Sequence, residues 1–184
     1  QEIRPTDKFG GYIDLSGGTH SLQKQFLRLN TGEIGHSDVR AFASFSHSAA
    51  NVWRGPGKIE RYHVDANVEK RWAPGSSTDI VFGYTRSHQN IYRNPSLSQW
   101  KQYGTSFNYT GTYTAGDTNY YKINERFTNV VFGAMHNDFK LSDELKLHIE
   151  PYTTFQRGPN NYGSTIPIAG GYLGTQQYGT LDGY

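Results

Sequence analysis

The chain of 184 residues contains no cysteine, only one methionine and no long run of apolar residues. The missing cysteine excludes a disulfide framework, a thiolate metal site and a cysteine nucleophile. No run approaches the roughly 18 apolar residues that a membrane-spanning helix needs, and the first residues lack the pattern of a signal peptide. Lysine and arginine (18) barely exceed aspartate and glutamate (16), so no strong positive charge directs the chain to nucleic acid.

Aromatic residues and glycine are abundant instead. Aromatics make up 15% of the chain, with 14 tyrosines, and there are 21 glycines, although hydrophobic residues reach only 35%. Aromatic rings suit the pleated surface of half-exposed strands, and glycine supplies turn conformations. This composition predicts an all-β protein. It is compatible with strands that cross a membrane, because their apolar residues alternate and form no run.

Alternation of apolar and charged residues is clearest from Ile59 to Trp72, where a strand places successive side chains on opposite faces. One row reads Tyr62, Val64, Ala66, Val68, Lys70 and Trp72. The other row reads Arg61, His63, Asp65, Asn67, Glu69 and Arg71. A helix through the same residues would spread the charges around every side, so this pattern predicts a strand of about a dozen residues.

Similar or weaker alternation recurs along the chain. The ranges 39–47, 79–87 and 145–152 repeat the pattern, and 12–17, 22–34 and 127–139 show it less regularly. In the last of these, the run Val130, Val131 and Phe132 blurs the alternation. Together with 59–72, these segments predict about seven strands.

The connections between the predicted strands are short at one end and long at the other. Turn-forming residues occupy 35–38, 74–77 and 142–144, whereas 48–57, 89–126 and 158–184 are long and rich in Asn, Tyr, Gly and Pro. Outer-membrane barrels have this asymmetry, with short periplasmic turns and long extracellular loops. Trp72 near one end of its strand and Tyr62 toward the other fit the aromatic girdles of such barrels.

Four segments, in order and with matching spacing, carry a resemblance to a known family. They are Arg4–Leu15, Gly17–His20, Leu27–Glu33 and Trp53–Gly57. Their arrangement resembles the start of the β-barrel in the TonB-dependent receptors of Gram-negative outer membranes, and the resemblance covers most of residues 4–157. It assigns 1–10 to the end of a plug or linker, 11–157 to barrel strands with their turns and loops, and 158–184 to an incomplete extracellular loop.

The resemblance implies a transmembrane barrel of 22 antiparallel up-and-down strands, of which this chain would supply about seven. Such receptors reside in the bacterial cell outer membrane, in contact with its lipid, and take up a scarce nutrient such as siderophore-bound iron, cobalamin or an oligosaccharide. Uptake is driven by the TonB–ExbB–ExbD energy-coupling complex, which would act through an N-terminal part that this chain lacks. The resemblance implies neither an enzyme nor a cofactor, and nucleic acid is not an expected partner.

The long loops are the predicted site of substrate binding. They concentrate aromatic rings and cations suited to stacking on sugar or catecholate rings and to attracting anionic groups. The candidate residues are Trp53, Arg54, Tyr92, Arg93, Trp100, Tyr103, Tyr109, Tyr120 and Tyr121.

A second set of polar residues is expected to face a water-filled lumen. These residues are Arg61, His63, Asp65, Asn67, Glu69, Arg71, Lys146, His148 and Glu150. His63 with Asp65, and His148 with Glu150, lie two apart on one strand face, but two ligands do not make a metal site, and no metal is expected. No nucleophile elbow, HExxH motif or phosphate-binding glycine loop is present, so we do not expect an enzyme.

Two other interpretations remain open at this level. The chain could be a complete small outer-membrane barrel of eight strands, filled by its own side chains. It could instead be a soluble secreted β-sandwich that binds carbohydrate, with the apolar rows buried and the charged rows in water. The alternation alone fits either choice of buried face.

Overall fold

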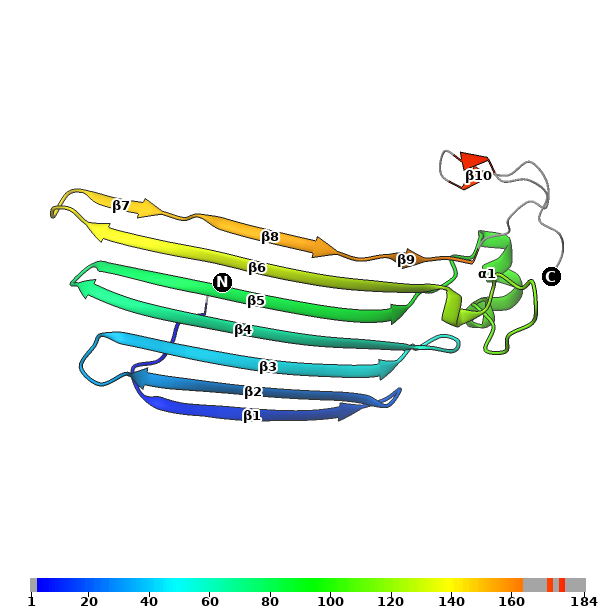
Figure 1. Cartoon of the computed structure of the whole chain (residues 1–184). Coiled ribbons are helices and arrows are strands. Elements are labelled where there is room, and N and C mark those ends of the chain that lie inside the picture. The colour runs from blue at the N-terminus through cyan, green and yellow to red at the C-terminus, as the bar shows by residue number, and fades with distance from the viewer. Residues whose placement is uncertain (1–2, 164–171, 174–175, 178–184) are drawn as a thin grey trace.

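A computed structural model describes residues 3–163, 172–173 and 176–177. Most of its strands form one antiparallel sheet in which each strand pairs with the next along the chain (Figure 1). The strands of this meander are β1 (Phe9–Gly18), β2 (Leu22–Glu33), β3 (Val39–Asn51), β4 (Lys58–Ala73), β5 (Ser76–Asn90) and β6 (Glu125–Lys140). Three short strands, β7 (Lys146–Ile149), β8 (Tyr152–Arg157) and β9 (Asn160–Asn161), then run in succession along β6. A separate two-stranded sheet joins β10 (Tyr172–Leu173) to β11 (Gln176–Gln177). The predicted all-β antiparallel meander is confirmed.

The last predicted strand, 145–152, is wrong in its bounds. The chain leaves strand geometry at Glu150 and Pro151, which separate β7 from β8. Proline has no N–H to donate to a ladder, but the Pro151 carbonyl still accepts a hydrogen bond from the Met135 N–H (3.0 Å). The pairing with β6 therefore continues past the break, and β9 falls inside the range 158–184 that was expected to be a loop.

The predicted loop 89–126 also contains regular structure. It holds the helix α1 (Leu97–Tyr103) and the 3-10 turns η1 (Gly104–Ser106) and η2 (Tyr121–Ile123). Ser96 caps α1 by accepting from the Gln99 N–H, and the Gln99 side chain accepts from the Ser96 N–H. This reciprocal pair is a capping box, so the helix has a local cause that the loop prediction overlooked. Among the described residues, no helix is long and apolar enough to cross a membrane.

The two ends of the sheet differ as predicted. At one end, β2–β3, β4–β5 and β6–β7 are joined by short turns, and at the other end the β5–β6 connection carries α1 (Figure 1). The β1–β2 hairpin at this second end is also tight, with His20 and Ser21 at positive φ (58° and 55°). We refer to these as the turn end and the loop end.

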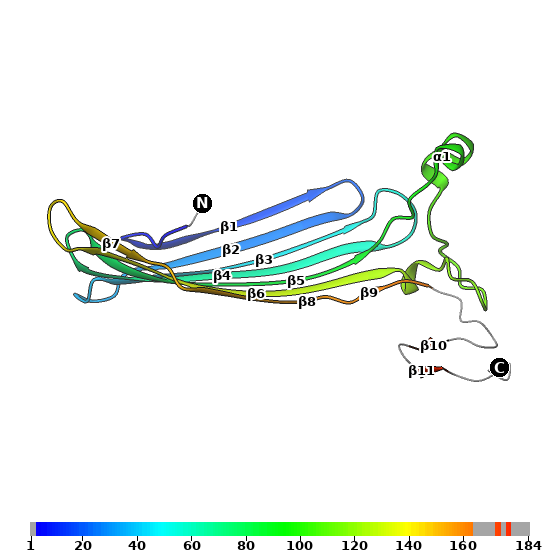
Figure 2. The ribbon, with the colours of Figure 1, turned by 90° about the horizontal axis from the view of Figure 1, so that it is seen from above.

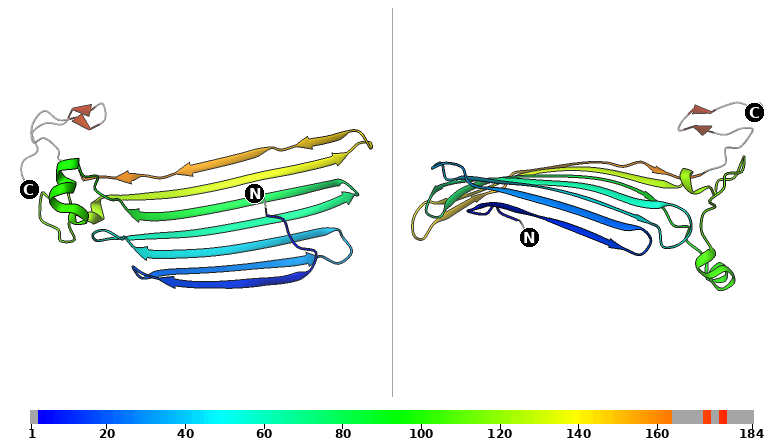
Figure 3. Two further views of the ribbon diagram at one scale, coloured as in Figure 1. Left: turned by 180° about the vertical axis from the view of Figure 1, so that it is seen from behind. Right: turned by 90° about the horizontal axis from the view of Figure 1, so that it is seen from below.

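The sheet is curved and open. Its strands bow so that one face is concave, and the N-terminal residues lie on that side (Figures 2 and 3). Among the described residues, β1 forms one edge and β7, β8 and β9 form the other, so the wall does not close on itself. A sandwich would need two large packed sheets and a small barrel would need closure, and the described strands form neither.

Burial is inverted relative to a soluble protein. The most deeply buried side chains are polar, with Asn67, Glu69 and Asp79 at 1%, 2% and 0% relative exposure. Large apolar side chains such as Ile13, Leu27 and Ile80 are exposed. Soluble domains do the opposite, because burying apolar area drives folding. The two faces of the sheet therefore differ in which side chains the chain itself covers.

Candidate functional site

The register places the predicted lumen-facing residues on the concave face. Directly paired residues in an antiparallel ladder lie on the same face, and the pairs Asn67 with Phe42 and Glu69 with Arg40 join the charged row of β4 to buried positions of β3. Lys146 and His148 on β7 pair with Lys140 and Asp138 of β6. The face collects Arg61, His63, Asp65, Asn67, Glu69, Arg71, Lys146 and His148, and Glu150 joins it through an ion pair with His136 (3.3 Å).

Residues 3–8, which we call the strap, cross this polar face near the turn end. The Asn67 side-chain amide donates to the Ile3 carbonyl (3.4 Å). The Arg28 guanidinium donates to the Arg4 carbonyl (2.9 Å). These bonds satisfy two backbone carbonyls of the strap with side chains from β2 and β4.

A positive and a negative side chain of the strap, Arg4 and Asp7, each form ion pairs with the sheet. The Arg4 guanidinium lies 3.5 Å from the Asp79 carboxylate and 3.9 Å from that of Asp138. Asp7 lies 2.8 Å from Arg40 and 3.4 Å from Arg71.

The strap changes the environment of two predicted lumen residues. Glu69 is nearly inaccessible and pairs with Arg71 (2.9 Å), and Asn67 is likewise buried. Asn67 and Glu69 are therefore covered within the chain, whereas the other residues of this row are at least partly exposed. The alternation of β4 does not reveal the covering segment, because the strap lies 59 to 66 residues away from Asn67 and Glu69 in the chain.

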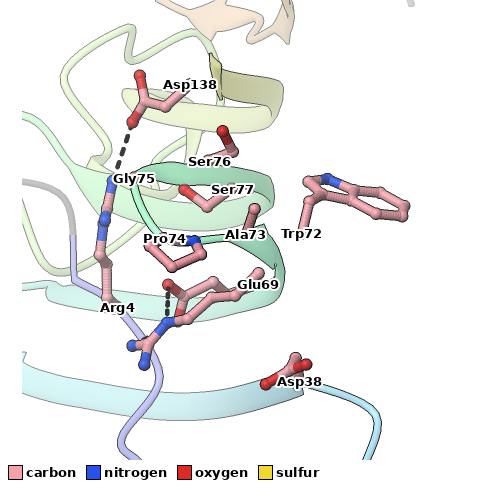
Figure 4. Close-up of a pocket in the computed structure, with 11 residues that line it drawn as sticks. Arg4, Asp38, Glu69, Trp72, Ala73, Pro74, Gly75, Ser76, Ser77 and Asp138 are labelled. Atoms are coloured by element: carbon pink, nitrogen blue, oxygen red, sulfur yellow. Dashed lines mark hydrogen bonds and ion pairs between the residues drawn. The ribbon is translucent and has the colours of Figure 1, made fainter. Parts of the chain in front are cut away.

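A hollow of about 570 Å³ lies beside the strap at the turn end. Arg4 and Asp138 face each other on one side of it, and Glu69 lies on another (Figure 4). Trp72 projects away from these charged groups (Figure 4). The hollow is thus lined by charges of both signs, two arginines and three carboxylates, which is a poor fit for a ligand of strong single charge.

The histidines of the polar face are held by partners of the same face. His63 lies 2.6 Å from the Thr85 hydroxyl and 2.8 Å from the Asp65 carboxylate. His148 contacts Asp138. In the part of the chain that the structure describes, no group of three or more His, Asp or Glu residues is arranged to hold a metal ion.

The loop end brings four of the predicted substrate residues together around Arg54. The Arg54 guanidinium lies 5.4 Å from the Trp53 ring and 5.2 Å from the Tyr92 ring, and it donates to the Arg93 carbonyl (2.9 Å). Asn108 joins the same two loop segments, because its side chain donates to the Arg54 carbonyl and accepts from the Arg93 N–H. Arg54 is buried, so it holds the loops together and presents little charge to a ligand.

The second arginine of this cluster has a similar role. The Arg93 guanidinium stacks on Phe107 at 4.6 Å. Burial raises the pKa of the nearby Tyr109 hydroxyl, although the positive charge of Arg93 opposes this. The hydroxyl of Tyr109 is therefore protonated at neutral pH.

Two further predicted residues, Tyr120 and Tyr121, form a separate ring cluster with Tyr113. Tyr120 contacts Tyr121 and Tyr113 edge to face, with ring centroids 5.2 and 5.5 Å apart. The backbone N–H of Asn119 donates to Asp117 and lowers the pKa of that carboxyl, which keeps it ionised in the loop. Tyr113 was not among the predicted residues. Its exposure and its contact with the Tyr120 ring are visible only in the structure.

Trp100 and Tyr103 lie on α1, apart from the Arg54 cluster. The helix projects beyond the loop end on the concave side of the sheet, which is the side that carries the strap (Figures 2 and 3). Tyr103 contacts Phe107 with a centroid distance of 6.1 Å. The exposed rings of the loop end include those of Trp53, Trp100, Tyr103 and Tyr113.

Sequence reasoning missed the asparagines that shape the loops. Asn90 and Asn124 are buried: Asn90 accepts from the Lys58 N–H and donates to Glu125, and Asn124 donates to the Thr118 and Tyr120 carbonyls. Their only signal in the sequence was the asparagine-rich composition of the connections.

Comparison with known proteins gives no identity, because no family model, no curated protein and no solved structure matches the chain.

Proposed function

We propose that this chain is part of the barrel wall of a TonB-dependent receptor, which takes up a scarce nutrient across the bacterial outer membrane. The observation that carries the proposal is the inverted burial of the sheet. Exposed apolar rows on a convex face, and buried charges on a concave face, suit a wall between hydrocarbon and a polar interior. In water alone, such a sheet would expose a large apolar patch.

The convex face supports this proposal row by row. Cross-strand pairing makes one continuous apolar row of Leu27, Phe45, Val64, Tyr84, Val131 and Phe155. The next row toward the turn end contains Leu29, Ala43, Ala66, Phe82 and Gly133, and a third contains Ala41, Val68, Ile80 and Met135. No charged residue interrupts these three rows.

The height of the apolar band matches a membrane. Tyr62 and Trp72 flank it on β4, ten positions apart. At about 3.3 Å per residue they are roughly 33 Å apart along the strand. A strand tilt of about 40° reduces this to about 25 Å, the height of the lipid-facing band in outer-membrane barrels.

Lys70 is the one lysine between Tyr62 and Trp72 on β4, and its side chain extends toward the turn end. Lys70 donates to the Ser37 carbonyl in the β2–β3 turn, and its ammonium group lies 5.4 Å from the Trp72 ring. Its charge is thus carried to the turn end, beside an aromatic residue. Lysines near a membrane interface extend in this way to reach water.

The open edges and the strap fit a larger barrel with material inside it. The exposed edges of β1 and β7–β9 need further strands before they could lie in lipid, because unpaired backbone groups are costly there. The strap already covers the concave face, where the proposed lumen would be. We assign nutrient contact to the exposed rings at the loop end and energy coupling to parts of the receptor outside this chain.

The decisive experiment compares two neighbouring valines in the intact protein. Val131 belongs to the convex face and Val130 to the concave face. Val131→Cys and Val130→Cys are each spin-labelled in bilayers, in a background without other cysteines. We expect the Val131 label to be more accessible to oxygen, which concentrates in lipid, and the Val130 label to be more accessible to a water-soluble nickel chelate. Equal accessibilities at the two sites, or the reverse order, would refute the membrane wall.

A further inference from the structure

A polar row borders the apolar band on the convex face at the loop end. Cross-strand pairing aligns Gln25, His47, Tyr62, Arg86, Asn129 and Arg157 on six neighbouring strands. This row lies directly beside the apolar row that contains Val64 and Val131. Its members therefore face outward at the boundary of the band, not into the concave interior.

The two arginines of this row are available for a ligand. Arg86 and Arg157 are both exposed, and within the described residues neither makes an ion pair. They lie on β5 and β8, with β6 between them, so their backbones are about 10 Å apart. Asn129 lies between them, and its amide oxygen accepts from the Tyr84 hydroxyl, which leaves its NH2 group as a donor.

The acidic residues near this row already have partners. Glu60 lies 3.0 Å from His47 and accepts from the Tyr62 hydroxyl (2.9 Å). Glu125 lies 3.2 Å from His88 and accepts from the Asn90 amide. A hollow of about 220 Å³ opens among Glu60, Tyr62, Arg86, His88 and Phe127. Within that hollow, the guanidinium of Arg86 makes no ion pair with a carboxylate.

The turn end lacks an equivalent arrangement. There the row beside the band contains Val39, Lys70, Thr78 and Asn137, and Lys70 donates to the Ser37 carbonyl. The hydroxyl of Thr78 accepts from Trp72 and donates to Asn137. The donors of this row are thus engaged within the protein, which distinguishes the two boundaries of the band.

We propose that Arg86 and Arg157, with Asn129 between them, bind the phosphate groups of an anionic lipid headgroup in the leaflet at the loop end. Guanidinium groups bind phosphate through paired, charge-assisted hydrogen bonds. The adjoining apolar row offers a surface for acyl chains, which a free anion would not use. The inference rests on the proposed membrane location.

The test uses the intact protein in phosphatidylcholine nanodiscs, with a bisphosphorylated glycolipid (lipid A) as the probe. Native mass spectrometry measures lipid retention for the wild type, for the double variant Arg86→Gln/Arg157→Gln, and for Arg61→Gln. Arg61 lies on β4 on the opposite face, so its variant controls for loss of charge alone. We expect about tenfold weaker binding for each arginine removed from the row and no change for Arg61→Gln.

Three results would overturn the lipid site. They are undiminished retention by the double variant, equal retention of the dephosphorylated glycolipid, and displacement of the lipid by millimolar inorganic phosphate, which would indicate a free-anion site. The oxygen accessibility of the Val131 label separates this failure from that of the proposed function. A protein with a lipid-accessible label that ignores lipid phosphate lacks the site, whereas a water-accessible label contradicts the membrane wall itself.

Discussion

The two faces of this sheet are built from the same strands and are opposite in chemistry. On the convex face, Phe82 and its neighbours expose apolar side chains, and on the concave face Glu69 and Asp79 are buried among charges. Phe132 shows that the difference is not a matter of residue type, because it lies on the concave face with an exposure close to that of Phe82 (38% against 43%). An exposed phenylalanine therefore occurs on both faces, and the difference between the faces lies in the charged residues that surround it.

The largest expected effect comes from placing a charge on each face. Phe82 and Phe132 lie on the adjacent strands β5 and β6 and point to opposite faces. For the intact protein in bilayers, we expect Phe82→Arg to lower the free energy of unfolding by about 2–4 kcal/mol, because an arginine there would face hydrocarbon in the proposed membrane wall. Phe132→Arg should cost far less, since its face is polar and carries Asp65. Urea titration in bilayers measures both, and equal losses would erase the distinction between the faces.

A smaller effect is expected from the ion pairs. Glu69→Gln removes the carboxylate that Arg71 contacts at 2.9 Å in a buried setting. We expect a loss of about 2 kcal/mol, because a hydrogen-bonded arginine beside the strap would lose its charged partner. Glu60→Gln changes a carboxylate of the convex face that is far more exposed than that of Glu69 (37% against 2%), and it should cost under about 1 kcal/mol. Denaturant unfolding of the two variants checks the order, and the reverse order would show that the strap does not shield its charges.

The smallest effect on stability, though not on binding, concerns the loop end. Trp53→Ala combined with Trp100→Ala removes two exposed rings from the proposed nutrient surface. For the proposed receptor in its intact form, we expect at least about tenfold weaker nutrient binding, because exposed tryptophans dominate such contacts. Trp72→Ala, at the turn end, is the matched control and should leave affinity unchanged. Isothermal titration decides, and unaltered affinity in the double variant would exclude these loops as the recognition surface.

The parts of the fold that local pattern controls were predictable. The alternation of Ile59–Trp72 indicated β4, and the turn residues at 74–77 indicated the reversal into β5, because both signals depend on near neighbours. The run Val130, Val131 and Phe132 hid its alternation, since apolar residues occur on both faces of β6. Ser96 and Gln99 form a capping box, which is a local helix signal inside a segment whose composition is that of a loop.

The candidate site was predictable only as a set of residue types. The nine polar residues were correctly placed on one face, yet the burial of Asn67 and Glu69 depends on Ile3 and on other strap residues far away in sequence. In the loops, Arg54 looked like a ligand-binding cation. The structure instead engages it with Trp53, Tyr92 and the Arg93 carbonyl. Such contacts arise from loop closure between distant segments, which no local pattern records.

The sequence by itself determined which residues share a face, because a strand alternates its side chains with a period of two. It also determined where the chain reverses, because glycine, proline and short polar residues set turn conformations locally. Only the tertiary structure decided which face is covered, that the sheet curves around its charged side, and that the two edges stay open. Alternation is symmetric between inside and outside, so the choice rests on contacts between segments that are far apart in the chain.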